Sequence, residues 1–156
     1  MYPAEYGDDP LFPQAEDFVV ELKNHVAGKG IKCLKAYKKG DTLAKLAGEI
    51  VGAMREHSFQ INSNKHLDDE YFIGYFLHSC DPNTEINTKK LIATAIKNIK
   101  PGDFITIDYT ATEDYLFRQF NCNCGSKNCR GVIAGKKETP RSAQSVVGYF
   151  DDEDDD

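Results

Sequence analysis

Short stretches rich in apolar and β-branched residues alternate with turn residues along most of this chain. The clearest is Phe-Ile-Thr-Ile-Asp-Tyr at 104–109. Such stretches recur at intervals of about 8 to 12 residues, a spacing that predicts a mostly β domain of short strands. The predicted strands are 17–22, 31–36, 43–46, 48–51, 59–61, 65–67, 71–73, 88–97 and 104–109.

Only one segment has the period of a helix. In 113–120, Tyr115, Leu116 and Phe120 fall at roughly helical spacing, which predicts a short helix. Residues 1–16 contain three prolines and predict an irregular arm. Residues 135–156 are rich in polar residues, and the pattern predicts a linker that leads into a disordered tail.

Composition bounds the class of protein. The chain has 156 residues, 40% of them hydrophobic and 28% charged, which suits one soluble globular domain. No apolar run approaches the roughly 20 residues that a membrane helix needs, and the N-terminus has no secretory pattern. We therefore expect an intracellular protein without a membrane partner, in the cytoplasm or the nucleus. In such a compartment five cysteines favour metal binding or free thiols over disulfides.

The net charge of −6 belongs to one end of the chain. All six residues of 151–156 are acidic, and the remainder carries 19 acidic and 19 basic residues. A solubilising tail is the simpler interpretation, and attraction of a basic partner is the alternative. Because the body has no basic stripe, we expect no direct binding to nucleic acid.

Three cysteines lie close together in a polar segment, at Cys122, Cys124 and Cys129, with Gly125 at the turn. Buried apolar cysteines seldom have such polar neighbours, so the pattern predicts metal binding. Structural zinc takes four protein ligands, and the remaining candidates are Cys33 and Cys80.

Cys33 has the pattern of a packing residue in a strand, whereas Cys80 follows a polar His78-Ser and precedes a turn. We therefore predict Cys80 as the fourth ligand of one structural zinc. Lys127 and Arg130 would offset the negative charge of four thiolates.

Five motifs together resemble a known family. They are Gly28-Lys-Gly30, Gly48-Glu49, His78-Ser-Cys80-Asp-Pro-Asn83, the segment 102–109 and the cysteine segment 122–131. In this order they are similar to the SET-domain protein lysine methyltransferases with a post-SET zinc knuckle. The resemblance implies a SET domain over 17–110, made of short curved sheets with a knot-like threaded segment. It also implies a post-SET helix and zinc knuckle over 111–134.

The resemblance also implies roles for particular residues. S-adenosylmethionine would be the cofactor, bound by Lys29, Gly30, Tyr75, Leu77, His78, Tyr109 and Phe120. Tyr109 would be the catalytic tyrosine, and Cys80, Cys122, Cys124 and Cys129 would bind the zinc. Without the neighbouring motifs, Tyr109 would be an ordinary tyrosine at the end of a strand.

The chain departs from the family pattern at three positions. Leu77 and Tyr75 replace an asparagine and an arginine, and Ile107 replaces an aromatic residue that helps to set the number of methyl groups added. A leucine cannot make the hydrogen bonds of an asparagine, so we expect weaker cofactor binding. The insert between Gly48 and Leu77 is also short.

The favoured function is therefore methyl transfer to a lysine of a protein, with basic, histone-like tails as candidate substrates. Two alternatives remain. The replaced residues leave open a non-catalytic SET-like module that binds a peptide or the cofactor. The short insert leaves open a methyltransferase that acts on a free amino acid or a small amine.

Overall fold

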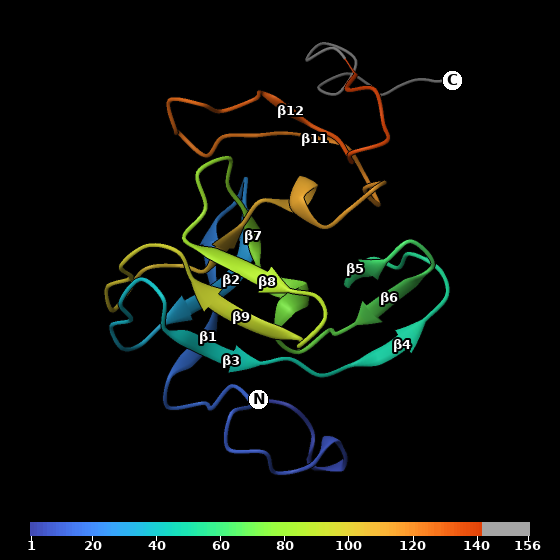
Figure 1. Cartoon of the computed structure of the whole chain (residues 1–156). Helices are drawn as coiled ribbons and strands as arrows, with labels where there is room; N and C mark the ends of the chain where they lie inside the picture. The colour runs from blue at the N-terminus through green and yellow to red at the C-terminus, as the bar shows by residue number, and fades with distance from the viewer. Residues whose placement is uncertain (142–156) are drawn as a thin grey trace.

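The computed structural model describes residues 1–141, which form short strands arranged in five small sheets (Figure 1). The predicted acidic tail at 151–156 lies outside the described residues. The helical elements within 1–141 are 3₁₀ turns, and none could cross a membrane. The mostly β class predicted from the sequence is thus confirmed.

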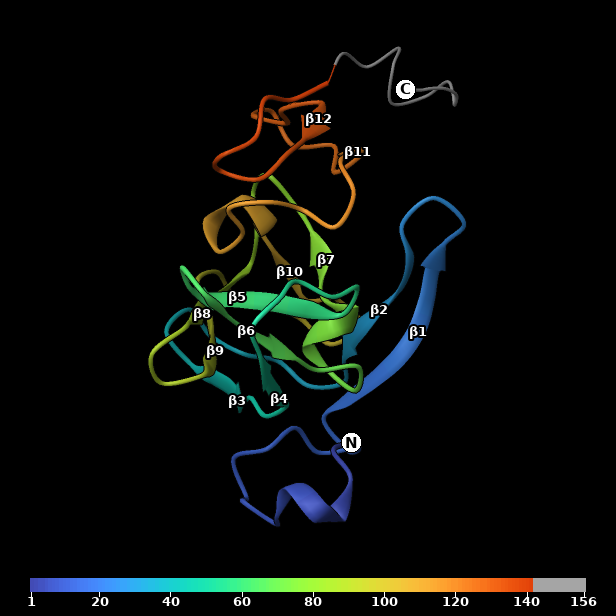
Figure 2. The ribbon, with the colours of Figure 1, turned by 90° about the vertical axis from the view of Figure 1, so that its right-hand side faces the viewer.

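Two antiparallel three-stranded sheets and a hairpin make up the body. The elements in chain order are η1 (Ala4–Tyr6), β1 (Phe18–Asn24), β2 (Gly28–Cys33), β3 (Thr42–Lys45), β4 (Glu49–Val51), β5 (Ser58–Asn62), β6 (Lys65–Asp68), η2 (Ile73–Tyr75), β7 (Leu77–His78), β8 (Thr84–Asn87), β9 (Ile92–Ala95), β10 (Thr106–Ile107), η3 (Tyr109–Ala111), β11 (Phe120–Asn121) and β12 (Val132–Ile133). The sheets are β3-β9-β8 and β4-β6-β5, and β1 and β2 form the hairpin. Figure 2 shows this hairpin projecting from the body, with β11 and β12 at the opposite end from the N-terminus.

A parallel pair brings distant segments together at the centre. β7 pairs with β10 in the register Thr106 with Leu77 and Ile107 with His78. Asn83 strengthens this crossing, because its amide nitrogen donates to the carbonyl of Phe104 and its amide oxygen accepts from Thr106 N–H. The segments that precede Cys80 and Tyr109 are therefore held side by side.

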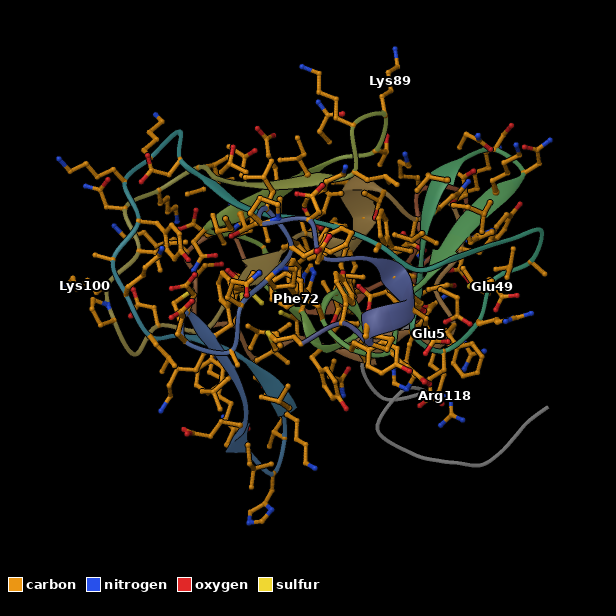
Figure 3. All side chains as sticks on the ribbon, turned by 90° about the horizontal axis from the view of Figure 1, so that it is seen from below. Glu5, Glu49, Phe72, Lys89, Lys100 and Arg118 are labelled. Carbon is orange, nitrogen blue, oxygen red and sulfur yellow. The ribbon has the colours of Figure 1, made fainter. Side chains whose placement is uncertain are left out.

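The core contains aromatic rings from several elements. Phe72 and Phe18 are almost fully buried with ring centroids 5.1 Å apart, and Phe76 lies 5.0 Å from Phe72. Figure 3 shows Phe72 near the middle of the molecule, with Lys89 and Lys100 at its edge. Burial of such rings is the main driving force for this fold.

Two predicted elements are wrong, and both errors have the same physical cause. The segment predicted as a strand over 71–73 is a turn that leads into η2 at Ile73, because the buried Asp69 carboxylate accepts hydrogen bonds from the N–H groups of Tyr71, Phe72 and Ile73. The helix predicted over 113–120 is absent. Asp114 N–H donates to the Gln60 side chain and Leu116 N–H to Glu138, so these donors do not bind carbonyls one turn back. In both segments side chains bind the backbone N–H groups, from the neighbouring Asp69 in the first and from the distant Gln60 and Glu138 in the second.

The strand predicted over 104–109 is shorter than expected. Its residues pair with three different segments and not with one neighbouring strand. Ile105 N–H binds the Ile31 carbonyl, Thr106 N–H binds the Asn83 side chain, and β10 pairs with β7. The pattern of 88–97 produces a strand only at 92–95. β8 at 84–87 was not predicted, because Thr-Glu-Ile-Asn carries little apolar signal.

The predicted irregular arm is tied to the core through Tyr2. The Tyr2 hydroxyl donates to Asp69 and accepts from Ala47 N–H at 3.1 Å. Its ring contacts Phe72 edge-on. Burial raises the pKa of both Tyr2 and Asp69.

Replacing Tyr2 with phenylalanine should lower the free energy of unfolding by about 1–3 kcal/mol, because it leaves the buried Asp69 carboxylate and the half-buried Ala47 N–H without this partner. Urea denaturation would measure the loss. Tyr6→Phe is the matched control, since no described hydrogen bond uses the Tyr6 hydroxyl, and its effect should stay within about 0.5 kcal/mol. Equal effects of the two changes would contradict the role given to the Tyr2 hydroxyl.

Candidate active site

Four of the five cysteines meet at one place. Cys80 follows β7, and Cys122, Cys124 and Cys129 lie in the cysteine loop (residues 122–129) between β11 and β12. Their Sγ atoms all lie within 4.8 Å of one another. Ligands about 2.3 Å from a tetrahedral zinc would lie about 3.8 Å apart, so the four thiols fit this ion. The structure thus brings together the four residues that were predicted as zinc ligands.

Cys33 is fully buried in β2, in the main core. Burial raises the pKa of its thiol to about 12, so it remains protonated. Its predicted role as a packing residue is confirmed.

Arg130 and Asn128 attach the cysteine loop to the body. Arg130 N–H donates to Cys80 Sγ at 3.4 Å, and the Asn128 side chain donates to the Cys80 carbonyl at 3.2 Å. The Arg130 guanidinium binds both oxygens of Asp108, at 2.6 and 3.1 Å. Arg130 was expected to offset the thiolate charge. Its guanidinium pairs with Asp108, the residue before Tyr109. Burial raises the pKa of Cys80, and the charge of Arg130 opposes this larger effect by lowering that pKa.

His78 links the cysteines to Tyr109. Its Nδ1 accepts from Tyr109 N–H at 3.1 Å, which leaves the proton on Nε2, 3.4 Å from Cys80 Sγ. Burial lowers the pKa of His78 to about 4, so the ring is neutral. Such a donor to a metal ligand fixes the ligand's orientation.

Tyr109 is held in place through its hydroxyl and its ring. The hydroxyl donates to the carbonyl of Phe76 at 2.5 Å. Its ring meets those of His78 and Phe120 edge-on, with centroids 5.2 and 5.8 Å away. Burial, followed by the charge of Glu113, raises the pKa of Tyr109 to about 12. The hydroxyl is therefore neutral at physiological pH and cannot serve as a strong base.

Two cavities adjoin Tyr109. The hairpin cavity, of about 480 Å³, is lined by Lys23, Asn24, Val26, Ala27, Leu77, His78, Tyr109 and 120–124. The β5 cavity, of about 250 Å³, is lined by 54–59, Ile73, Gly74, Phe76, Ile107, Tyr109, Thr112, Glu113, 116–118 and Phe120. Tyr109 and Phe120 line both cavities. Tyr109 thus lies between a cavity that can hold a larger molecule and a cavity of smaller volume.

This arrangement agrees with a comparison against protein families. The family model described as "SET domain" matches residues 15–110. The chain belongs to the SET-domain family. The SET match ends directly after Tyr109, and the cysteine loop follows it.

Curated relatives of this SET chain include named methyltransferases. It is 28% identical over 142 residues to histone-lysine N-methyltransferase trithorax of Drosophila virilis, covering 76% of this chain and 4% of that protein. It is 37% identical over 117 residues to methyltransferase flvH of Aspergillus flavus, covering 73% of this chain and 66% of flvH. The chain therefore spans a small part of trithorax and about two thirds of flvH.

Solved structures share the SET fold. The structure of KRYPTONITE in complex with mCHG DNA and SAH superposes with a TM-score of 0.61 at 22% identity, over 74% of this chain and 29% of that one. The methyltransferase domain of human SETMAR gives a TM-score of 0.59 at 20% identity, over 79% and 59%. The predicted fold of short sheets with a threaded segment is confirmed.

The structure gathers some of the predicted cofactor residues and not others. Leu77, His78, Tyr109 and Phe120 all line the hairpin cavity of the SET domain. Lys29 and Gly30 lie in β2, and Tyr75 packs against the main core. None of these three residues lines either of the two cavities. Their roles in cofactor binding stay predictions.

Leu77 and Gly30 fit against each other closely. A Cβ atom on Gly30 would lie 2.7 Å from Leu77 Cδ1 and 2.9 Å from the Phe104 ring. Gly30 therefore leaves room for the leucine that replaces the family's asparagine. Leu77 makes this part of the wall of the hairpin cavity apolar.

The sequence interpretation missed Glu113, which lines the β5 cavity. Gln60 N–H donates to Glu113, and the Gln60 side chain exchanges hydrogen bonds with Asp114. The signal was the acid pair Glu113-Asp114, which begins four residues after Tyr109, and the predicted helix obscured it.

Proposed function

We propose that this protein transfers a methyl group from S-adenosylmethionine to the amine of a protein lysine. The observation that carries the proposal is that two cavities share Tyr109 and Phe120. The SET family and the names of its histone-lysine methyltransferase relatives support it. Because the chain spans only 4% of trithorax, substrates and partners are proposed for this chain alone.

The hairpin cavity suits the cofactor. A volume of about 480 Å³ lies within the usual range for small-molecule sites. S-adenosylmethionine would supply an electrophilic methyl group there. Leu77 and Phe120 would exclude water, and the ring nitrogens of His78 are already engaged by Tyr109 and Cys80. Any contact from His78 would therefore use its backbone or the face of its ring.

The β5 cavity suits an extended side chain that reaches Tyr109. A free lysine amine has a pKa near 10.4, whereas the nucleophile must be neutral. Desolvation and a nearby positive charge both lower this pKa, so the site needs no strong base. Tyr109 would orient the amine and the methyl group through its oxygen, because its proton is held by the Phe76 carbonyl.

Zinc in this chain would be structural. Cys80, Cys122, Cys124 and Cys129 would complete a tetrahedral shell and leave no position for a substrate. The ion would join the segment after His78 to the loop that contributes Cys122 and Cys124 to the hairpin cavity.

Leu77→Asn should strengthen binding of S-adenosylmethionine. An added hydrogen bond to a charged or strongly polar group is worth about 1.5–3 kcal/mol, or about one to two decades in affinity. Isothermal titration calorimetry of both proteins would measure the change. Leu22→Asn is a control on the exposed part of the hairpin. Weaker binding by Leu77→Asn would show that the apolar wall itself serves the cofactor.

A second candidate function is methyl transfer to a free amino acid or another small amine. Its support is that the match to flvH covers 73% of this chain and 66% of flvH, whose name specifies a methyltransferase and no protein substrate. The short segment between Gly48 and Leu77, which includes β4, β5 and β6, also leaves little surface for a long peptide.

Calorimetry with S-adenosylmethionine tests the shared basis of both candidates. We expect one cofactor per chain. Binding without transfer to core histones or free lysine would support the non-catalytic module. The absence of binding would overturn the assignment of the hairpin cavity.

A further inference from the structure

Among the charged side chains that line the β5 cavity, only that of Glu113 is buried. It is only 7% exposed, whereas the other charged lining residues, Arg55, Glu56 and Arg118, are exposed. A buried carboxylate is costly unless hydrogen bonds or an opposite charge compensate it. Its position beside Tyr109 therefore requires an explanation.

The carboxylate is only half satisfied. Its Oε2 accepts from Gln60 N–H at 2.8 Å and from the Thr112 hydroxyl at 2.6 Å. Its Oε1 accepts no hydrogen bond from residues 1–141. Two donors thus fix the orientation of the group and leave one oxygen available to the cavity.

Within residues 1–141 no positive side chain forms an ion pair with Glu113. Burial raises the pKa of Glu113, and the nearby charge of Lys136 partly opposes this rise. Arg55 pairs with Glu49 and Asp68, at 3.4 and 3.0 Å. The Arg118 guanidinium lies over the Phe117 ring. Lys136 Nζ points to the carbonyl of Ala111 at 3.4 Å. A cation that enters the cavity would therefore be the first direct partner of Oε1.

We propose that Glu113 is a specificity-determining residue, which selects a substrate bearing an ammonium group over a neutral side chain of the same length. The inference rests on the proposed function, because it assigns the β5 cavity to the amine. It concerns recognition alone, since methyl transfer needs the neutral amine. It applies equally to a protein lysine and to a small amine, because both present the same cation.

Glu113→Gln separates this role from a structural one. Glutamine keeps an oxygen that can accept from Gln60 and Thr112, and it removes only the charge. The probes are n-butylammonium, which reproduces the end of a lysine side chain, and neutral 1-butanol. NMR titration of the amides of Gln60 and Thr112, without cofactor, would give both dissociation constants.

The wild type should bind n-butylammonium at least about tenfold more tightly than 1-butanol, and Glu113→Gln should remove this preference. Glu113→Asp should retain part of it. Glu85→Gln on exposed β8 is the control for net charge and should leave the preference unchanged. A wild type without preference, or a Glu113→Gln protein that keeps it, would overturn the inference.

The result does not depend on the cofactor. If the wild-type protein does not bind S-adenosylmethionine, the proposed function is rejected, but the preference for butylammonium should still be observed. If Glu113→Gln does not fold, the wild-type titration still tests the inference. Butylammonium should then cause its largest NMR shifts at the amides of Gln60 and Thr112, and larger shifts elsewhere would overturn the inference.

Discussion

Tyr109→Phe is expected to lower the methyl-transfer rate constant by about 10²-fold or more, a typical effect of removing one positioned polar group from an active site. The hydroxyl is held against the Phe76 carbonyl, at the wall between the two cavities. Its loss leaves the apolar lining intact. Binding of S-adenosylmethionine should therefore change by less than about threefold.

Turnover under saturating cofactor and calorimetry of cofactor binding would separate these effects. Tyr115→Phe is the matched control, since Tyr115 is 54% exposed and lines neither of the two cavities. An unchanged rate in Tyr109→Phe would remove Tyr109 from the catalytic machinery.

Removal of the metal should have the second large effect. Cys80→Ser replaces the ligand that joins the body to the cysteine loop, and metal binding contributes directly to folding free energy. We expect less than one zinc per chain, a lower melting temperature, and cofactor binding weakened by about tenfold or more, because 120–124 line the hairpin cavity.

Cys33→Ala provides the contrast. It should lower the melting temperature by creating a small void in the core, yet leave the zinc content unchanged. Elemental analysis measures the metal in each protein. A metal-free wild type, or full zinc in Cys80→Ser, would contradict the four-thiolate site.

The sequence predicted those parts of the site whose chemistry demands particular residue types. Three clustered cysteines require a fourth ligand, and that requirement led to Cys80, which the structure places within 4.8 Å of the others. The chemistry of zinc thus predicted a contact between residues 42 positions apart.

Local pattern failed where side chains, and not backbone carbonyls, accept hydrogen bonds from the backbone N–H groups. Asp69 turns the segment that was predicted as a strand, and Gln60 and Glu138 bind donors in the segment that was predicted as a helix. Such contacts leave no periodic signal. The β5 cavity and Glu113 were missed for this reason.

We propose that the chain moves a methyl group from S-adenosylmethionine to an amine at Tyr109. The most direct measurement is incubation of the wild-type protein with methyl-labelled S-adenosylmethionine, core histones and free lysine. The account predicts label on one of these amines, and its near-complete loss with Tyr109→Phe. No label on either amine, together with no cofactor binding by calorimetry, would contradict it.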